Sequence, residues 1–399
     1  MLHRIYFTPG MFGFGRLASY DYFGHLDRAL CARLRARGER IETHVLQVSP
    51  TASIRRRAAK LAELVAETCG DDGPIHLIGH STGWLDARLV ASPSAALAAP
   101  PGALAWRDRL ASITTINTPH FGTPLASFFT TVSGGRVLRA LSALTVLGLS
   151  LGSHPLAAMS GLVAAFARVD RALGFELAVF DRVTDAFLQL LDDARSNDVR
   201  QYIDSIQKDQ GAMVQLMPEA MDLFAAGIED RPGLLCQSVA SMAPPPGPGM
   251  LLPALFRPAS IPSAAIFSLL YGISARYDSR YPCSAPNTSE DAEEMLGRVF
   301  ARTPGVREND GVVPLRSQLW GKLVWVGYGD HLDVLGHFRD DKRAATSPGD
   351  DGGPPHVDWL FSASGFDRAR FGSLVDAITP GLVSSGCAVP VSRATGPSL

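Results

Sequence analysis

The sequence predicts an α/β protein with a mostly parallel sheet and a large helical insertion. Strand-like apolar segments alternate with amphipathic helical segments over the first 120 residues, which is typical of βαβ units. This alternation stops at Phe121, and residues 125–230 have mostly helical patterns. Strand patterns then return, so we expect a core formed by residues 1–124 and 231–385, an insertion at 125–230 and a tail at 386–399.

The elements of the core follow in a regular order. Gly38 has the residue type expected just after a helix, and Ser53 the type expected just before one. The prolines of the apolar stretch 243–262 exclude a central strand there. Strands are expected at 4–10, 41–48, 74–81, 110–119, 233–242 and 322–329, and helices at 20–38, 53–70, 82–92 and around 366–378.

Within the insertion, residues 140–167 carry no charged side chain apart from His154. The length of this segment would allow a membrane span. A Gly-Ser-His-Pro sequence at 152–155 instead favours two shorter apolar helices joined by a turn.

The composition excludes several classes of protein. The 399 residues carry a formal net charge of −2, so no basic excess indicates nucleic-acid binding. The densest basic cluster, Arg55 to Arg57, is expected to form a solvated helix face. Five scattered cysteines form neither a disulfide framework nor a zinc motif, although one disulfide remains open. Nothing before the first strand resembles a signal peptide, so we expect a cytoplasmic protein, or a secreted one if a leader was removed.

The segment Gly79-His80-Ser81-Thr82-Gly83 indicates a nucleophile. It follows the strand-like "IHLIG" and precedes a helical pattern, the context in which Gly-x-Ser-x-Gly forms a sharp strand-to-helix turn. An ordinary glycine-bounded turn is the alternative. The turn would lift the Ser81 hydroxyl above the sheet edge and place it at a helix N-terminus.

A serine nucleophile needs a base and an acid, expected in the order Ser, Asp or Glu, His. His331 directly follows the strand at 322–329, and Asp310 lies 21 residues before it in an Asn-Asp-Gly loop that could also be only a turn. His337 is the alternative base. His80 and His120 border the site but lie outside the expected chain order of Ser, then Asp or Glu, then His, so a structural role fits them better.

The oxyanion hole should use two backbone N–H groups. We expect one from Thr82 and one from Met11, in the loop after the first strand. Phe12, Trp84 and His80 flank these positions and are the expected substrate-binding residues.

Four motifs carry a resemblance to a known family. "PGMFGFG" follows the first strand, "GHSTGWLDAR" contains the serine, "TTINTPHFGTPLA" follows the next strand, and "NDGVVP" with "GDHLD" completes the set. The chain resembles bacterial triacylglycerol lipases of the α/β-hydrolase superfamily, of the kind secreted by Pseudomonas and Burkholderia. The resemblance implies the α/β-hydrolase fold, a triad of Ser81, Asp310 and His331, and a lid formed by the insertion.

The chain departs from the family pattern at several positions. Pro9 stands where His is usual, and the disulfide common in secreted members is missing. The family often binds a structural calcium through an Asp two residues after the catalytic histidine. Asp333 matches that ligand, but the second ligand has no match. Trp84 replaces a glycine, so its indole either narrows the acyl channel or packs into the base of the lid.

The expected function is that of a serine ester hydrolase acting on apolar esters, a lipase or carboxylesterase that requires no cofactor. A polyester depolymerase, a thioesterase or an acyltransferase could use the same triad, and a binding protein could keep the fold without activity. The expected partners are a lipid ester and, through the lid, a lipid interface, but no nucleic acid. The sequence does not indicate the oligomeric state.

Overall fold

The computed structural model describes the sheet, the helices beside it and parts of the insertion. Phe12 and the apolar segment 140–167 of the predicted lid lie outside the described residues. The residues described are 1–11, 16–17, 20–49, 51–131, 134–135, 137–138, 209, 211–247, 250, 260–284, 288–340, 356, 358 and 360–388.

A six-stranded parallel sheet forms the centre of the molecule. All six predicted strands are present, which confirms the expected fold class. β5 and β6 are buried along their whole length, as expected for central strands of a parallel sheet. In spatial order the strands are β4 (Arg40–Val45), β1 (Leu2–Thr8), β5 (Ile75–His80), β6 (Leu110–Ile116), β7 (Leu235–Met242) and β8 (Lys322–Tyr328).

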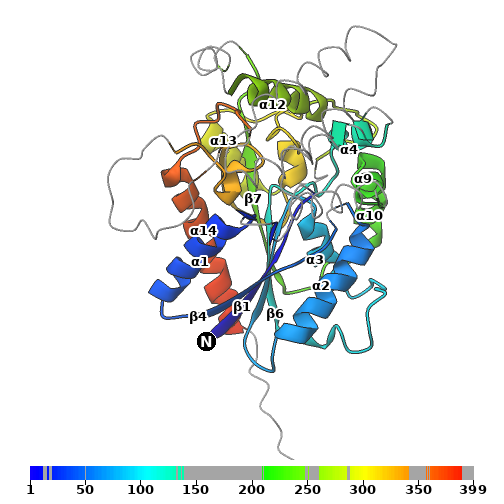
Figure 1. Cartoon of the computed structure of the whole chain (residues 1–399), viewed down its shortest axis with the longest axis vertical. Helices are drawn as coiled ribbons and strands as arrows, with labels where there is room; N and C mark the ends of the chain where they lie inside the picture. Colours follow the sequence, from blue (N-terminus) through cyan, green and yellow to red (C-terminus); the bar gives the residue numbers. More distant parts are fainter. Residues whose placement is uncertain are drawn as a thin grey trace, which may run out of the picture.

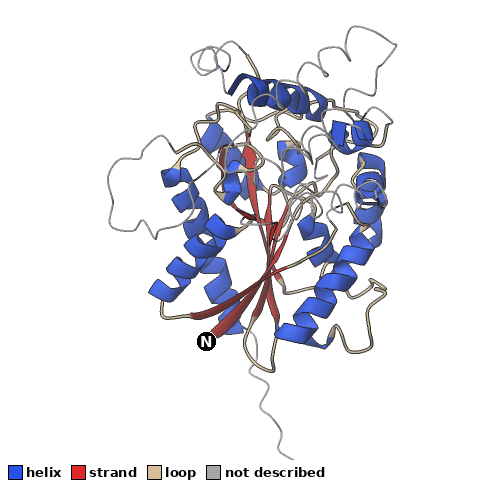
Figure 2. Ribbon diagram, in the orientation of Figure 1, coloured by secondary structure: helices blue, strands red, loops and turns tan. Residues whose placement is uncertain are grey.

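Helices cover both faces of this sheet (Figures 1 and 2). On one face α1 packs against α14, and on the other α2 packs against α3. Side chains of β1 enter the hydrophobic cores on both faces of the sheet. Ile5 and Phe7 join the core beneath α1 and α14, and Tyr6 joins the core beneath α2 and α3. These helices are α1 (Gly24–Ala36), α2 (Ile54–Thr68), α3 (Gly83–Ala91) and α14 (Arg368–Ala388).

A second group of elements lies beyond the carboxyl ends of the strands, towards the top of Figure 1. Helix α4 contacts both α9 and α12, so segments on either side of β7 meet there. These helices are α4 (Pro124–Phe129), α9 (Gly211–Gln215), α10 (Pro218–Gly227), α12 (Ile261–Ser274) and α13 (Glu290–Phe300). Short elements are the antiparallel pair β2 (Arg16–Leu17) and β3 (Tyr20–Asp21), and the 3-10 helices η1 (Ala105–Arg109), η3 (Leu315–Gln318) and η4 (Asp333–Leu335).

The structure corrects two expectations about helices. Arg57 is fully buried rather than part of a solvated face, although Arg55 and Arg56 are exposed. Helix α14 continues to Ala388 through Pro380, past the predicted start of the tail at 386.

Two further expectations concern cysteines and membrane spans. Cys31, Cys69, Cys236 and Cys283 are free thiols. Among the described residues, no helix combines the length and apolar character that crossing a membrane requires.

Candidate active site

Ser81 occupies a strained turn at the carboxyl end of β5. Its φ angle of 55° lies in the left-handed region, which costs a non-glycine residue energy. The Ser81 N–H donates to the carbonyl of Ile116 at 2.9 Å, so the neighbouring strand holds this conformation. The turn delivers Ser81 to the N-terminus of α3, as the Gly-x-Ser-x-Gly motif predicts.

The two glycines of the motif are required for space. A Cβ atom on Gly79 would lie 2.5 Å from the backbone N and Cα of Trp84. A Cβ atom on Gly83 would overlap the carbonyl oxygen of Thr8, at the end of β1. Strand β1, the turn and helix α3 therefore pack backbone against backbone at this point.

The loop after β1 lies directly against the nucleophile. A Cβ atom on Gly10 would lie 2.6 Å from Ser81 Cβ and 3.2 Å from Ser81 Oγ. The next residue is Met11, the predicted oxyanion donor, which is buried. Thr82, the other predicted donor, is the N-cap of α3. Within the described part of the chain, neither residue's N–H donates to a backbone carbonyl.

A buried ion pair holds this loop from below. The Arg57 guanidinium contacts the Asp86 carboxylate at 2.8 to 3.1 Å, and both side chains are fully buried. Arg57 Nη2 also donates to the carbonyl of Pro9 at 2.5 Å. Helices α2 and α3 thus fix the backbone two residues before Met11, at the position where this chain departs from the family pattern.

Asp310 and His331 meet in the folded chain, although 21 residues separate them. His331 Nδ1 lies 2.7 Å from Asp310 Oδ2, and the His331 N–H donates to the Asp310 carbonyl at 3.0 Å. Both side chains are buried. Because a carboxylate only accepts hydrogen bonds, Nδ1 carries the proton and the Nε2 lone pair is left to act as a base.

His331 Nε2 is buried and has no hydrogen-bond partner within the described part of the chain. It is therefore not bonded to the Ser81 hydroxyl in this state. In hydrolases such bonds are often long without substrate and tighten when substrate binds.

The Asp310 carboxylate is held by donors that the sequence did not reveal. Oδ1 accepts from the N–H groups of Val312 and Val313 at 2.8 and 2.7 Å. Oδ2 accepts from Gln318 Nε2 at 3.3 Å, and Gln318 is itself fixed to both backbone groups of Ser241 on β7. No sequence motif includes Gln318, because its role depends on a contact between η3 and β7.

Two predicted substrate-binding residues have other surroundings. His80 is fully buried, and both ring nitrogens are bonded to protein groups, which does not favour the predicted contact with substrate. Trp84 is also fully buried, and its ring packs against His120 and Trp320. Arg88 covers both indoles and contacts Phe224 of α10. The structure thus favours packing at the base of the insertion over a wall of the acyl channel.

The alternative base, His337, is bonded to the connection between β1 and α1. Its side chain is buried, and Nε2 lies 3.1 Å from the carbonyl of Tyr22, to which it donates. Burial lowers the pKa of His337 to about 4. We therefore retain His331 as the base.

The carboxylate of Asp333, the predicted calcium ligand, accepts hydrogen bonds from neighbouring protein groups. Asp333 Oδ2 accepts from the N–H of Asp330 at 2.8 Å and from the Ser364 hydroxyl at 2.7 Å. The Asp330 carboxylate is likewise bonded, to Ser362 and to two backbone N–H groups. Burial raises the pKa of Asp330 well above its ordinary range and that of Asp333 to about 6. The described residues hold no group of three His, Cys, Asp or Glu side chains placed to bind a metal ion, and the calcium site stays a prediction.

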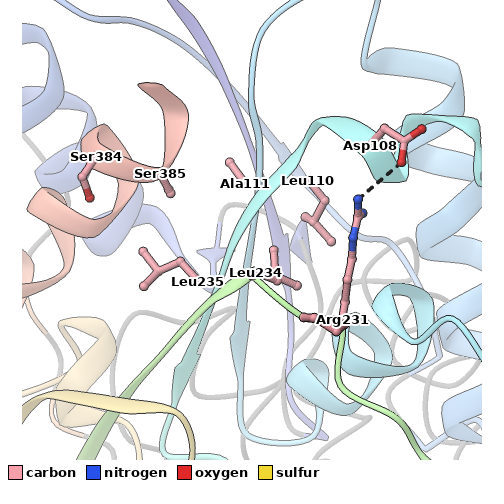
Figure 3. A pocket seen from close by; sticks show the side chains of 10 residues that line it. Asp108, Leu110, Ala111, Arg231, Leu234, Leu235, Ser384 and Ser385 are labelled. Carbon is pink, nitrogen blue, oxygen red and sulfur yellow. Dashed lines mark hydrogen bonds and ion pairs between the residues drawn. The ribbon is translucent and has the colours of Figure 1, made fainter. Parts of the chain in front are cut away.

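A cavity of about 330 Å³ lies at the amino ends of the central strands, opposite the end that carries Ser81 (Figure 3). Leu110 and Leu235 line it at the first residues of β6 and β7, whereas Ser81 follows the last residue of β5. Arg231 in its wall contacts Asp108 at 3.3 Å, and the Ser385 hydroxyl donates within α14. Among the described residues that line it, no nucleophile faces a base.

Known proteins similar to this chain include bacterial lipases. No protein-family model matches the chain. A triacylglycerol lipase of Vibrio cholerae serotype O1 is 32% identical over 126 residues, which is 31% of this chain and 35% of that lipase. The chain therefore matches about a third of the length of this curated relative.

Solved lipase structures are similar over most of the chain. Lipase 1 from Pelosinus fermentans has a TM-score of 0.47 at 18% identity, covering 84% of this chain and 93% of its own. Staphylococcus hyicus lipase has a TM-score of 0.50 at 16% identity, covering 97% of this chain and 96% of its own. The chain has the α/β-hydrolase fold. The predicted resemblance to bacterial lipases is confirmed by the match to the Vibrio lipase.

Proposed function

We propose that this α/β-hydrolase is a serine ester hydrolase that cleaves apolar carboxylic esters through an acyl-enzyme on Ser81. One observation carries the proposal. The Asp310 carboxylate fixes the proton of His331 on Nδ1, at 2.7 Å, and leaves Nε2 as a buried base without a partner. The strand-to-helix turn presents Ser81 just after the carboxyl end of β5, and His331 likewise follows the carboxyl end of β8.

The reaction follows from the roles of these groups. His331 Nε2 removes the hydroxyl proton as Ser81 Oγ attacks the ester carbonyl, and the Asp310 carboxylate stabilises the imidazolium that forms. The N–H groups of Met11 and Thr82 bind the oxyanion at the N-terminus of α3. The imidazolium then protonates the leaving alcohol. Water, deprotonated by the same nitrogen, attacks the acyl-enzyme and releases the acid and Ser81.

An apolar substrate is supported by the likeness to a triacylglycerol lipase and by the surface near the carboxyl edge. Exposed apolar side chains occur on the linked helices α9, α10 and α12, namely Val214, Leu223 and Ile261. We propose that the insertion acts as a lid and that this surface contacts a lipid interface. Hydrogen exchange in residues 125–230 should change when an ester analogue binds, and no change there would exclude gating.

A fluorophosphonate probe tests the proposed chemistry. The wild-type protein should be labelled and should hydrolyse a chromogenic ester, while Ser81→Ala abolishes labelling. His331→Ala should lower kcat by about 10⁴-fold or more, because the nucleophile is inert without its base. His337→Ala serves as the comparison and should keep far more activity. An unlabelled wild-type protein would contradict the proposal, and an active His331→Ala with an inactive His337→Ala would reassign the base.

A further inference from the structure

His80 connects the nucleophile turn to the loop that carries the base. It is fully buried, directly precedes Ser81, and its Nε2 lies 2.8 Å from the carbonyl oxygen of His331. The two imidazole rings also pack together, with centroids 4.6 Å apart. Its Nδ1 lies 2.6 Å from the hydroxyl of Tyr22.

The hydrogen-bond network fixes the tautomer of His80. A carbonyl oxygen only accepts, so His80 Nε2 carries the proton and donates to His331. The Nδ1 lone pair must then accept from the Tyr22 hydroxyl. Burial and the nearby His331 lower the pKa of His80 well below its ordinary value, which keeps this neutral form populated.

Tyr22 extends the network to the connection between β1 and α1. This connection also contains Met11, the predicted oxyanion donor. The Tyr22 carbonyl accepts from His337 Nε2 at 3.1 Å, so the chain six residues after His331 is bound to it as well. The hydrogen bonds run from Tyr22 through His80 to His331, and from His331 to Asp310 at 2.7 Å.

We propose that His80 and Tyr22 are positioning residues that set the orientation of the base, His331, towards Ser81. The inference rests on the proposed ester-hydrolase function. Asp310 fixes the far side of the His331 ring, and the bond from His80 ties the backbone of His331 to the strand that presents Ser81. A displacement of about 1 Å between reacting groups can cost on the order of 10²-fold in rate.

The test separates the two bonds of His80. His80→Asn keeps an acceptor near the Tyr22 hydroxyl but is too short to reach the His331 carbonyl. His80→Gln keeps an amide donor at the position of Nε2 and should rescue. We expect His80→Asn to lower kcat by about 10²-fold with little change in KM, and His80→Gln to recover most of the loss. Tyr22→Phe should give a smaller loss of kcat.

His76 provides a matched control on the same strand. It is also fully buried with both ring nitrogens bonded, to His3 and Ser112 at 2.9 and 2.8 Å, but lies near the amino end of β5. His76→Asn should lower the urea midpoint as His80→Asn does, while kcat stays near the wild-type value.

Each outcome has one meaning. Equal kcat losses in His80→Asn and His76→Asn, or no rescue by His80→Gln, would overturn the positioning role. If His80→Asn does not fold, the comparison of His80→Gln, Tyr22→Phe and His76→Gln decides in its place. In that case a lower kcat in Tyr22→Phe that His76→Gln does not share would support the positioning role, and an unchanged kcat in Tyr22→Phe would overturn it. A wild-type protein that the fluorophosphonate does not label would instead defeat the proposed function and the inference with it.

Discussion

Trp84→Ala is the perturbation whose cost the structure defines best. Among the described residues, Trp84 has the largest side chain that is fully buried. Its ring centroid lies 3.9 Å from that of His120 and 4.4 Å from that of Trp320, with the Arg88 guanidinium 5.4 Å away. Removing such an indole destabilises a core by about 3–5 kcal/mol.

Two further contributions act in opposite directions. Loss of the contact with Arg88 adds about 0.5–2 kcal/mol to the cost. Against this, Trp84 Nε1 is buried and has no hydrogen-bond partner among the residues that the structure describes, so removing it recovers about 1–3 kcal/mol of desolvation. We therefore expect Trp84→Ala to lower the free energy of unfolding by about 3–4 kcal/mol. Trp84→Phe keeps a ring and loses the unpartnered N–H, so it should be close to neutral.

Trp106 supplies the control. It is also buried, but its Nε1 donates to the carbonyl of Ala103 at 2.7 Å. Trp106→Phe should therefore cost more than Trp84→Phe. The assay is urea unfolding followed by far-ultraviolet circular dichroism, together with hydrolysis of esters of graded acyl length.

Either of two results would refute the reasoning. The first is a loss below about 1 kcal/mol for Trp84→Ala. The second is a shift towards bulkier acyl groups in Trp84→Ala that Trp106→Ala does not share, because it would place the indole in the acyl channel.

Three other predictions follow from buried groups. Gly83→Ala should lower the free energy of unfolding by about 1–3 kcal/mol or more and lower activity, because the new Cβ overlaps the Thr8 carbonyl. Gly297→Ala is the control and should be neutral or stabilising, because no atom lies within 4 Å of its new Cβ. Equal urea midpoints for the two variants would contradict this. Asp86→Asn leaves the Arg57 charge buried without its partner and should lower the free energy of unfolding by about 3–5 kcal/mol. Asp278→Asn removes one member of an exposed pair with Arg280 and should change stability little. Matching losses of stability in the two variants would refute the buried-pair argument. Burial lowers the pKa of His337 in the folded protein to about 4, from an ordinary 6.5. The unfolded chain therefore binds a proton that the folded protein does not, and stability falls as the pH drops from 6.5 to about 4. The stability of His337→Gln should fall less steeply over this range, and parallel plots of stability against pH would exclude the effect.

Much of the fold follows from local patterns in the sequence. Strands β5 and β6 are buried on both faces, so they form apolar runs that can be recognised without their neighbours. The turn at Ser81 is equally local, since its strand, glycines and helix are contiguous in the chain. Asp310 and His331 could be chosen because the fold places acid and base after later strands in a fixed order. Their catalytic roles stay predictions until the variants are measured.

The tertiary structure alone decided the contacts between residues that are distant in the chain. The three consecutive arginines at 55–57 look alike in the sequence, yet only Arg57 is buried, because α3 places Asp86 opposite it. Trp84 could have faced substrate or core until the positions of His120 and Trp320 were known. The same holds for Gln318, because a local pattern records the periodicity of one element and not the partner that packing brings to it. The sequence by itself therefore determined which residues can do chemistry, and the packing of the strands and helices decided which side chains hold them in place.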